Sequence, residues 1–172
     1  MKVINLWAGP GAGKSTTAAG LFYIMKTWGA RCELVTEYAK ELVYEKRSMT
    51  DQLYILAQQN KRLERLREHV DWAITDSPLP LGLAYANEGY KGDWYENTTS
   101  ALFNSYDNIN FRIIRTKEYQ AYGRNQLESE ARSLDDAIAE ILSMYDQAPT
   151  EIPGDLDAPN KIFEKIKGLN NK

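Results

Sequence analysis

Three closely spaced glycines followed by a lysine and a serine form the segment of this sequence best suited to chemistry. Residues 8–15 read AGPGAGKS and match the phosphate-binding loop GxxxxGK[ST], with alanine in place of the first glycine. Glycines let the backbone turn its N–H groups towards phosphate oxygens, and the N-terminus of a following helix adds the positive end of its dipole. The segment therefore predicts a site for the phosphates of a nucleotide.

The side chains at the end of this loop are expected to hold ATP together with a magnesium ion. Lys14 is expected to reach the β- and γ-phosphates as a point charge, while the Ser15 hydroxyl coordinates a Mg2+ ion that bridges them. Thr16 is expected beside the α-phosphate. The residues predicted to bind the nucleotide are Gly9, Gly11, Ala12, Gly13, Lys14, Ser15, Thr16 and Arg115. ATP and Mg2+ are the predicted cofactors.

Two carboxylates, Glu37 and Asp76, directly follow apolar runs that are expected to be strands. The carboxyl ends of parallel strands form the ligand crevice of α/β proteins. Asp76 stands where a carboxylate holds magnesium through water, and Glu37 is suited to take a proton from an acceptor hydroxyl or to bind the acceptor. The alternatives are structural, with Asp76 capping a turn and Glu37 stabilised by a helix dipole. The sequence leaves open which carboxylate is the general base.

A basic and aromatic stretch follows the fourth predicted strand and contains Arg115, Lys117 and Arg124. Residues 116–132 are expected to close over the nucleotide as a lid, with the Arg124 guanidinium near the transferring phosphoryl group. A solvated basic loop is the alternative. The predicted catalytic residues are Lys14, Glu37, Asp76 and Arg124, the predicted acceptor-binding residues are Glu37, Tyr38, Asp76 and Tyr85, and the predicted metal ligands are Ser15 and Asp76.

Strands and helices must bring these residues together. Short apolar runs predict strands at residues 3–7, 32–36, 72–75 and 111–114, and a weaker one at 150–152; helices are expected at 14–28, 38–44, 50–70, 81–88, 94–106, 133–145 and from 157 onwards. Strands that alternate with helices favour parallel pairing. The predicted fold is α/β, a three-layer P-loop fold with a mainly parallel sheet of four to five strands, in a single domain over residues 1–172.

Composition narrows the partners and the compartment. The chain has 172 residues, of which 43% are hydrophobic, enough for one globular core. Lys and Arg number 21 against 24 Asp and Glu, so no overall positive field attracts nucleic acid or an anionic membrane. One cysteine, Cys32, forms no internal disulfide, and no signal peptide or membrane span is recognised. The cytoplasm is the expected compartment, and a homodimer is left open.

With the phosphate-binding loop, residues 35–41 reading VTEYAKE and residues 74–78 reading ITDSP, the chain resembles small P-loop kinases of the nucleoside and nucleotide kinase group. It looks most like phage-encoded members and the ribosylnicotinamide kinase domain, over roughly residues 1–142. The resemblance implies ATP-dependent phosphorylation of a nucleoside- or nucleotide-like acceptor. Glu37, Asp76 and Arg124 stand where that group has its two strand-end acids and its lid arginine.

The acceptor and two other functions stay open at this stage. Residues 122–131 contain one arginine, whereas many nucleoside monophosphate kinases have several in the lid. This difference argues against a monophosphate acceptor and leaves nucleoside-like or unusual acceptors open. A kinase of a nucleic-acid end or of a modified DNA base is a second hypothesis, disfavoured by the net charge of −3. A P-loop ATPase switch without a small acceptor is the third.

Overall fold

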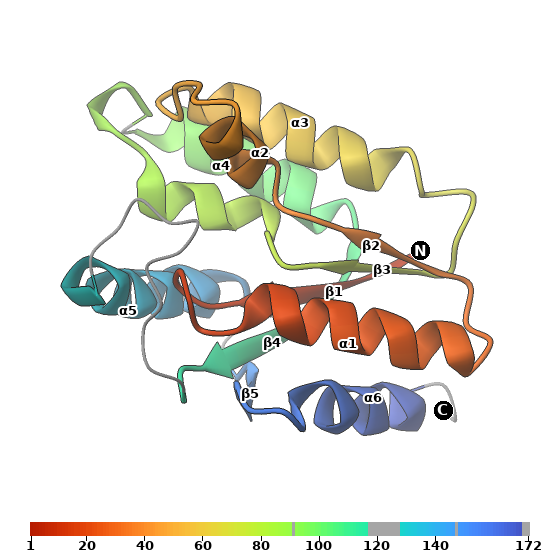
Figure 1. Ribbon diagram of the computed structural model, residues 1–172. Helices are drawn as coiled ribbons and strands as arrows, with labels where there is room; N and C mark the ends of the chain where they lie inside the picture. Colours follow the sequence, from red (N-terminus) through yellow and green to blue (C-terminus); the bar gives the residue numbers. More distant parts are fainter. Residues whose placement is uncertain (91, 117–127, 147, 170–172) are drawn as a thin grey trace.

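The computed structural model describes residues 1–90, 92–116, 128–146 and 148–169. Its centre is a five-stranded sheet in the order β2-β3-β1-β4-β5, in which every neighbouring pair is parallel (Figure 1). The strands are β1 (Lys2–Trp7), β2 (Cys32–Val35), β3 (Trp72–Thr75), β4 (Asp107–Ile114) and β5 (Thr150–Pro153). The predicted α/β fold with its parallel sheet is therefore confirmed, including the fifth strand at the sheet edge.

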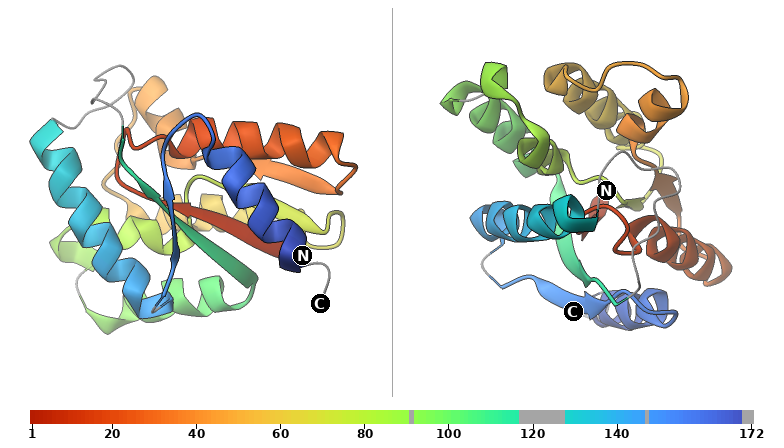
Figure 2. Two further views of the ribbon diagram at one scale, coloured as in Figure 1. Left: turned by 90° about the horizontal axis from the view of Figure 1, so that it is seen from below. Right: turned by 60° about the vertical axis from the view of Figure 1, so that its left-hand side comes forward.

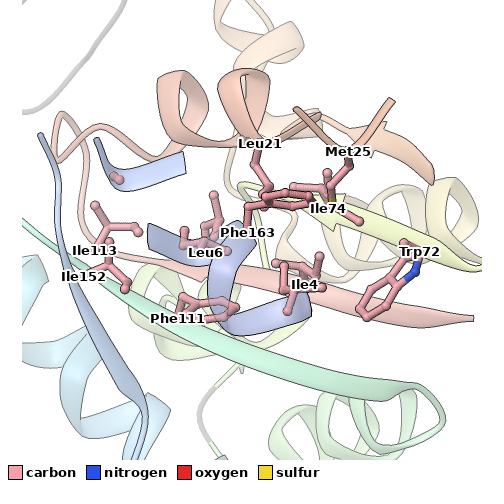
Figure 3. Packing of buried hydrophobic residues seen from close by; sticks show 14 of the residues in the cluster. Ile4, Leu6, Leu21, Met25, Trp72, Ile74, Phe111, Ile113, Ile152 and Phe163 are labelled. Carbon is pink, nitrogen blue, oxygen red and sulfur yellow. The ribbon is translucent and has the colours of Figure 1, made fainter. Parts of the chain in front are cut away.

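One face of the sheet is covered by α1 (Lys14–Thr27) and α6 (Ala158–Leu169), which lie side by side in Figure 1. Figure 3 shows Leu21 and Met25 of α1 meeting Phe163 of α6 above the strand residues Ile4 and Leu6. These five side chains are almost completely buried. Their burial contributes roughly 1.5–3 kcal/mol per side chain and holds α1 and α6 against β1.

The opposite face is covered by α3 (Gln52–Glu64), α4 (Asp93–Asn104), α5 (Glu128–Tyr145) and the 3-10 helix η1 (Leu79–Tyr85). Figure 2 shows these helices on the side of the sheet away from α1 and α6. Two short elements, α2 (Tyr38–Tyr44) and the 3-10 helix η2 (Glu88–Tyr90), complete the order. In the described part of the chain, no helix is both long enough and apolar enough to cross a membrane.

The fourth strand is twice as long as the sequence predicted. Its first half, beginning at Asp107, is polar and so gave no apolar run. The structure satisfies these polar groups in pairs: Asn5 donates to Asn108 Oδ1 at 2.9 Å, and the Trp7 indole donates to Asn110 Oδ1 at 3.0 Å. Side-chain amides that pair across neighbouring strands make a polar strand compatible with the interior.

Three predicted helices have different bounds in the structure. The helix expected at 50–70 ends at Glu64, after which i→i−3 backbone bonds tighten the chain. Residues 81–88 lie partly in η1, a 3-10 helix from Leu79 to Tyr85, and Gly82 within it is a poor α-helix former. Because α5 already includes Glu128, Ser133 does not cap it.

Candidate functional site

The loop between β1 and α1 has the backbone conformation that anion binding requires. Gly11 and Gly13 have φ angles of 81° and 102°, a left-handed region that only glycine enters without strain. Gly13 is the N-cap residue of α1, and no side chain forms a cap hydrogen bond there. The first N–H groups of α1 are therefore open to an anion, and the helix dipole favours one.

Lys14 lies at the floor of this loop and is only 9% exposed. Its Nζ donates to the carbonyl oxygens of Ala8 and Gly9 at 2.7 and 3.0 Å. Burial lowers the pKa of Lys14, and the nearby carboxylates of Glu37 and Asp76 partly oppose this shift. A desolvated cation beside the loop interacts strongly with an incoming phosphate, because the local dielectric is lower than that of water.

A cavity of about 320 Å³ opens beside the loop. Gly11, Gly13, Lys14, Ser15 and Thr16 line it on the loop side. The facing wall comes from α2, α3, η1 and α4, and contains apolar side chains together with polar ones such as Glu37 and Tyr85. The cavity therefore joins the predicted phosphate site to a mixed polar and apolar chamber that can hold a small molecule.

Glu37 belongs to the wall of this cavity. It is the N-cap residue of α2, with an extended backbone (φ −63°, ψ 121°), yet its side chain makes no cap hydrogen bond. Burial raises the pKa of Glu37, the Lys14 ammonium lowers it, and the Asp76 carboxylate raises it again. A carboxylate with a raised pKa beside a cavity is the arrangement that general-base chemistry uses.

Asp76 follows β3 and is 3% exposed. Its Oδ1 atom is buried and has no hydrogen-bond partner in the described part of the chain. The N-cap residue of η1 is Pro78, and no side chain forms a cap hydrogen bond at that helix start. Capping therefore does not explain Asp76, and its buried oxygen needs a partner that the described residues do not supply.

A magnesium ion fits this donor set. The described residues contain no group of three or more His, Cys, Asp or Glu that could hold a metal by themselves. Magnesium usually takes only one or two protein oxygens and fills its other positions with water and phosphate. Asp76 is not among the residues that line the cavity, but it lies close enough to Lys14 to affect the pKa of that lysine. The exposed Ser15 hydroxyl and Asp76 Oδ1, which has no partner among the described residues, would be the protein oxygens for such an ion.

Arg115 and Asp135 hold the outer rim of the phosphate loop. Asp135 of α5 accepts from the Gly9 N–H at 2.7 Å and from Arg115 Nε at 2.8 Å. Arg115 in turn donates to the Pro10 carbonyl at 2.9 Å, while its Nη1 is buried without a partner in the described residues. Two predicted nucleotide-binding groups, the Gly9 amide and the Arg115 guanidinium, are thus partly used within the protein.

A family model described as an AAA domain matches residues 3–158. The chain belongs to this AAA domain family. The match spans the loop, both strand-end acids and Arg115, so the chain is a P-loop nucleotide-binding domain. A search among curated proteins finds no match.

Of the other predicted site residues of the AAA domain, some line the cavity and some do not. Tyr85 lines it, and burial together with the Glu37 carboxylate raises the pKa of its hydroxyl. Tyr38 is not among the lining residues: its hydroxyl bonds to Tyr54 Oη at 3.1 Å and its ring lies 5.0 Å from the Arg62 guanidinium. Ala12 is buried in the core at 1% exposure.

The predicted lid lies largely outside the described residues. Arg124 and Lys117 both lie outside them, so the structure says nothing of the expected contact with a phosphoryl group. Within residues 116–132, the end that is described begins α5 at Glu128. The AAA domain thus shows its phosphate loop, its two strand-end acids and its cavity, while the lid stays a prediction.

Sequence reasoning missed Asp135, which contacts the phosphate loop, and Gln52 and Gln59, which line the cavity. Asp135 sits in an acidic helix where nothing distinguished it from its neighbour Asp136. Gln59 had a recognisable signal: it falls between Leu56 and Leu63 at helical spacing, on the buried face of α3. A polar side chain in an apolar stripe must find partners inside the protein.

Replacing Asp135 by alanine is expected to weaken nucleotide binding. The change leaves the Gly9 N–H without its acceptor and Arg115 without its carboxylate, a loss of about 1–3 kcal/mol for a charge-assisted contact, or roughly 5- to 150-fold in affinity. Titration calorimetry with ATP measures this. The exposed neighbour Asp136→Ala is the matched control, and equal affinities for both variants would contradict the assigned role.

Replacing Gly154 by alanine is expected to disturb the phosphate loop, because Gly154 packs closely against the backbone of Ala12. A Cβ at this position would lie 2.5 Å from the Ala12 carbonyl oxygen and 3.0 Å from that of Ile114. Backbone atoms cannot move aside cheaply, so we expect overpacking to cost about 1–3 kcal/mol in the free energy of unfolding. Gly168→Ala is the control, because nothing lies within 4 Å of its added carbon; urea unfolding compares the two, and equal midpoints would refute the clash.

Proposed function

We propose that this AAA domain is an ATP- and Mg2+-dependent phosphotransferase that acts on a small acceptor of the nucleoside- or nucleotide-like class. The observation that carries the proposal is the cavity of about 320 Å³ that opens on Lys14 and Ser15 and has Glu37 in its wall. Its size falls within the usual range of about 300–1,000 Å³ for small-molecule sites. An acceptor bound there lies next to the phosphates of the loop.

In the proposed reaction the phosphate loop binds the triphosphate and Lys14 offsets its negative charge. An acceptor hydroxyl in the cavity attacks the γ-phosphorus, its proton passes to the Glu37 carboxylate, and the bond from the γ-phosphorus to the β,γ-bridging oxygen breaks to release ADP. Magnesium, when bound at Ser15 and Asp76, neutralises charge on the phosphates. Asp76 and Glu37 thereby have separate roles, with Glu37 as the base.

The charges of the cavity favour an acceptor without phosphate. In the described part of the chain, its only basic side chains are Lys14, which serves the donor phosphates, and the exposed Lys40. The rest of the wall includes the aromatic rings of Tyr85 and Tyr95 and apolar side chains of α3 and η1. Rings and amides suit a nucleoside-like molecule, whereas a monophosphate needs a cluster of arginines or lysines.

Two other functions fit these features less well. A kinase of a nucleic-acid end needs an open basic groove for the backbone, and the net charge is −3 while the cavity wall is largely uncharged. A P-loop ATPase switch needs no acceptor chamber beside the phosphate loop. Family membership alone is compatible with that switch, so it remains the alternative hypothesis.

Incubation with ATP and Mg2+ and a panel of acceptors tests the proposal. The panel contains nucleosides, nucleotides, ribosylnicotinamide and oligonucleotides, and mass spectrometry follows a mass gain of one phosphoryl group. We expect transfer to a nucleoside-like member. ATP hydrolysis with no transfer to any member would favour the ATPase switch instead.

A further inference from the structure

Gln59 of α3 is a buried amide at the point where three elements of the site meet. It is 3% exposed and lines the cavity. Its Oε1 accepts from the Tyr38 N–H at 2.9 Å. Its Nε2 lies 3.4 Å both from the Thr36 carbonyl oxygen and from Thr75 Oγ1, so both of these hydrogen bonds are long. One side chain therefore connects the ends of β2 and β3 with the start of α2.

The contacts of Gln59 enclose the backbone of Glu37. Thr36 and Tyr38 are the two neighbours of Glu37, and the amide bonds one group from each. The first N–H groups of a helix have no partner within the helix and are usually satisfied by the side chain of the N-cap residue. Here the N-cap residue is Glu37, whose side chain makes no such bond. An N-cap side chain reaches the N–H of the second or third helical residue. The N–H of Tyr38, the first residue of α2, therefore needs another acceptor, and Gln59 supplies it.

The second strand end is held by the same amide. Thr75 Oγ1, which Gln59 Nε2 approaches, also accepts from the Ser77 N–H at 3.1 Å. These two bonds flank Asp76 and order the turn that carries it. Arg62, one helical turn further along α3, adds a bond from its Nη1 to the Thr36 carbonyl at 3.1 Å.

We propose that Gln59 is a positioning residue for the reaction: by bonding the residues on both sides of Glu37 and the residue before Asp76, it holds the Glu37 carboxylate at the cavity and sets its place relative to Asp76. This inference rests on the proposed phosphotransferase function. A displacement of about 1 Å in a reacting group can lower a rate by roughly 10²-fold. Loss of the amide is therefore expected to lower kcat and to leave the KM for ATP nearly unchanged, because Gln59 bonds no part of the phosphate loop.

The variant Gln59→Met keeps the length of the side chain and removes its hydrogen bonds; Gln58→Met, on the adjacent and less buried position of α3, is the matched control. We expect kcat of Gln59→Met to fall by roughly 10- to 100-fold with a KM for ATP within about twofold. Gln58→Met is expected to match the wild type. A kcat for Gln59→Met within twofold of the wild type would overturn the proposal.

Two further measurements separate positioning from a general loss of stability. Gln59→Glu retains an acceptor for the Tyr38 N–H and places a negative charge near Glu37, so the acid limb of its kcat–pH profile is expected to move to higher pH. An unmoved limb would contradict the placement of Glu37. Amide hydrogen exchange needs no activity: the peptide covering residues 36–40 is expected to exchange faster in Gln59→Met. Unchanged exchange would overturn the inference, whereas a wild type that transfers phosphate to no acceptor would overturn the proposed function.

Discussion

Replacing Lys14 by alanine is expected to lower phosphate transfer by at least about 10²- to 10³-fold, the usual effect of removing one group that stabilises transition-state charge. The Lys14 ammonium is the buried cation of the phosphate loop, 9% exposed, and it lies close enough to Glu37 and Asp76 for their charges to affect its pKa. Steady-state kinetics with ATP and the acceptor found in the panel measures the loss. Lys26→Ala, an exposed lysine on the same helix with a surface ion pair to Glu33, is the matched control.

This loss of activity is expected without a loss of folding. A lysine whose pKa is lowered on folding binds its proton less tightly in the folded protein than in the unfolded chain, so its charge costs stability at neutral pH. Its removal relieves that cost and also removes two hydrogen bonds to carbonyl oxygens, each worth about 1 kcal/mol. If the thermal unfolding midpoint of Lys14→Ala were well below that of Lys26→Ala, the loss of activity would come from an unfolded phosphate loop and not from the missing ammonium group.

Replacing Glu37 by glutamine is expected to lower kcat by roughly 10²- to 10⁴-fold, the usual contribution of a general base. Glutamine keeps the size of the side chain and cannot accept the proton. The KM for ATP is expected to change little, since in the proposed reaction Glu37 contacts the acceptor and is not part of the phosphate loop. Glu45→Gln, on an exposed glutamate that follows α2, is the control. A kcat for Glu37→Gln within a few-fold of the wild type would assign the base to another residue.

The pH dependence of kcat tests the same assignment. The base must be ionised, and burial raises the pKa of Glu37 above its usual 4.5. The rate is therefore expected to rise with pH through a midpoint above 4.5 in the wild type, and this limb is expected to be absent in Glu37→Gln. A raised pKa also means that the folded protein holds this proton more tightly than the unfolded chain, so the ionised carboxylate costs stability at neutral pH. Glu37→Gln is expected to be more stable than the wild type at pH 7, and a destabilised variant would contradict the account.

The sequence predicted those parts of the site that depend on local patterns. The phosphate loop combines special backbone conformations with a fixed order of residue types, and both are visible in residues 8–15. Asp76 and Glu37 were found because a residue after a buried strand lies at the ligand edge of a parallel sheet. Their burial raises the pKa of Glu37 and leaves Asp76 Oδ1 without a partner among the described residues. It depends on the packing of helices that are distant in sequence.

The parts that the sequence did not predict are contacts between distant elements. Asp135 meets Gly9 across 126 positions of the chain, and no local pattern distinguishes it from Asp136. Tyr38 follows a strand end as expected, yet its hydroxyl bonds to Tyr54, and Tyr38 is not among the residues that line the cavity. Strand β4 was predicted too short because its asparagines are satisfied only by neighbours that the fold brings to them.

The fate of the γ-phosphate in a single turnover tests the central claim most directly. Enzyme in excess is mixed with γ-labelled ATP, Mg2+ and the candidate acceptor, and the label is counted on the acceptor and as free phosphate while ADP forms. A phosphotransferase predicts label on the acceptor in step with ADP, and neither product with Lys14→Ala. Label that appears only as free phosphate, at a rate that no acceptor changes, would contradict the phosphotransferase account and favour a P-loop ATPase.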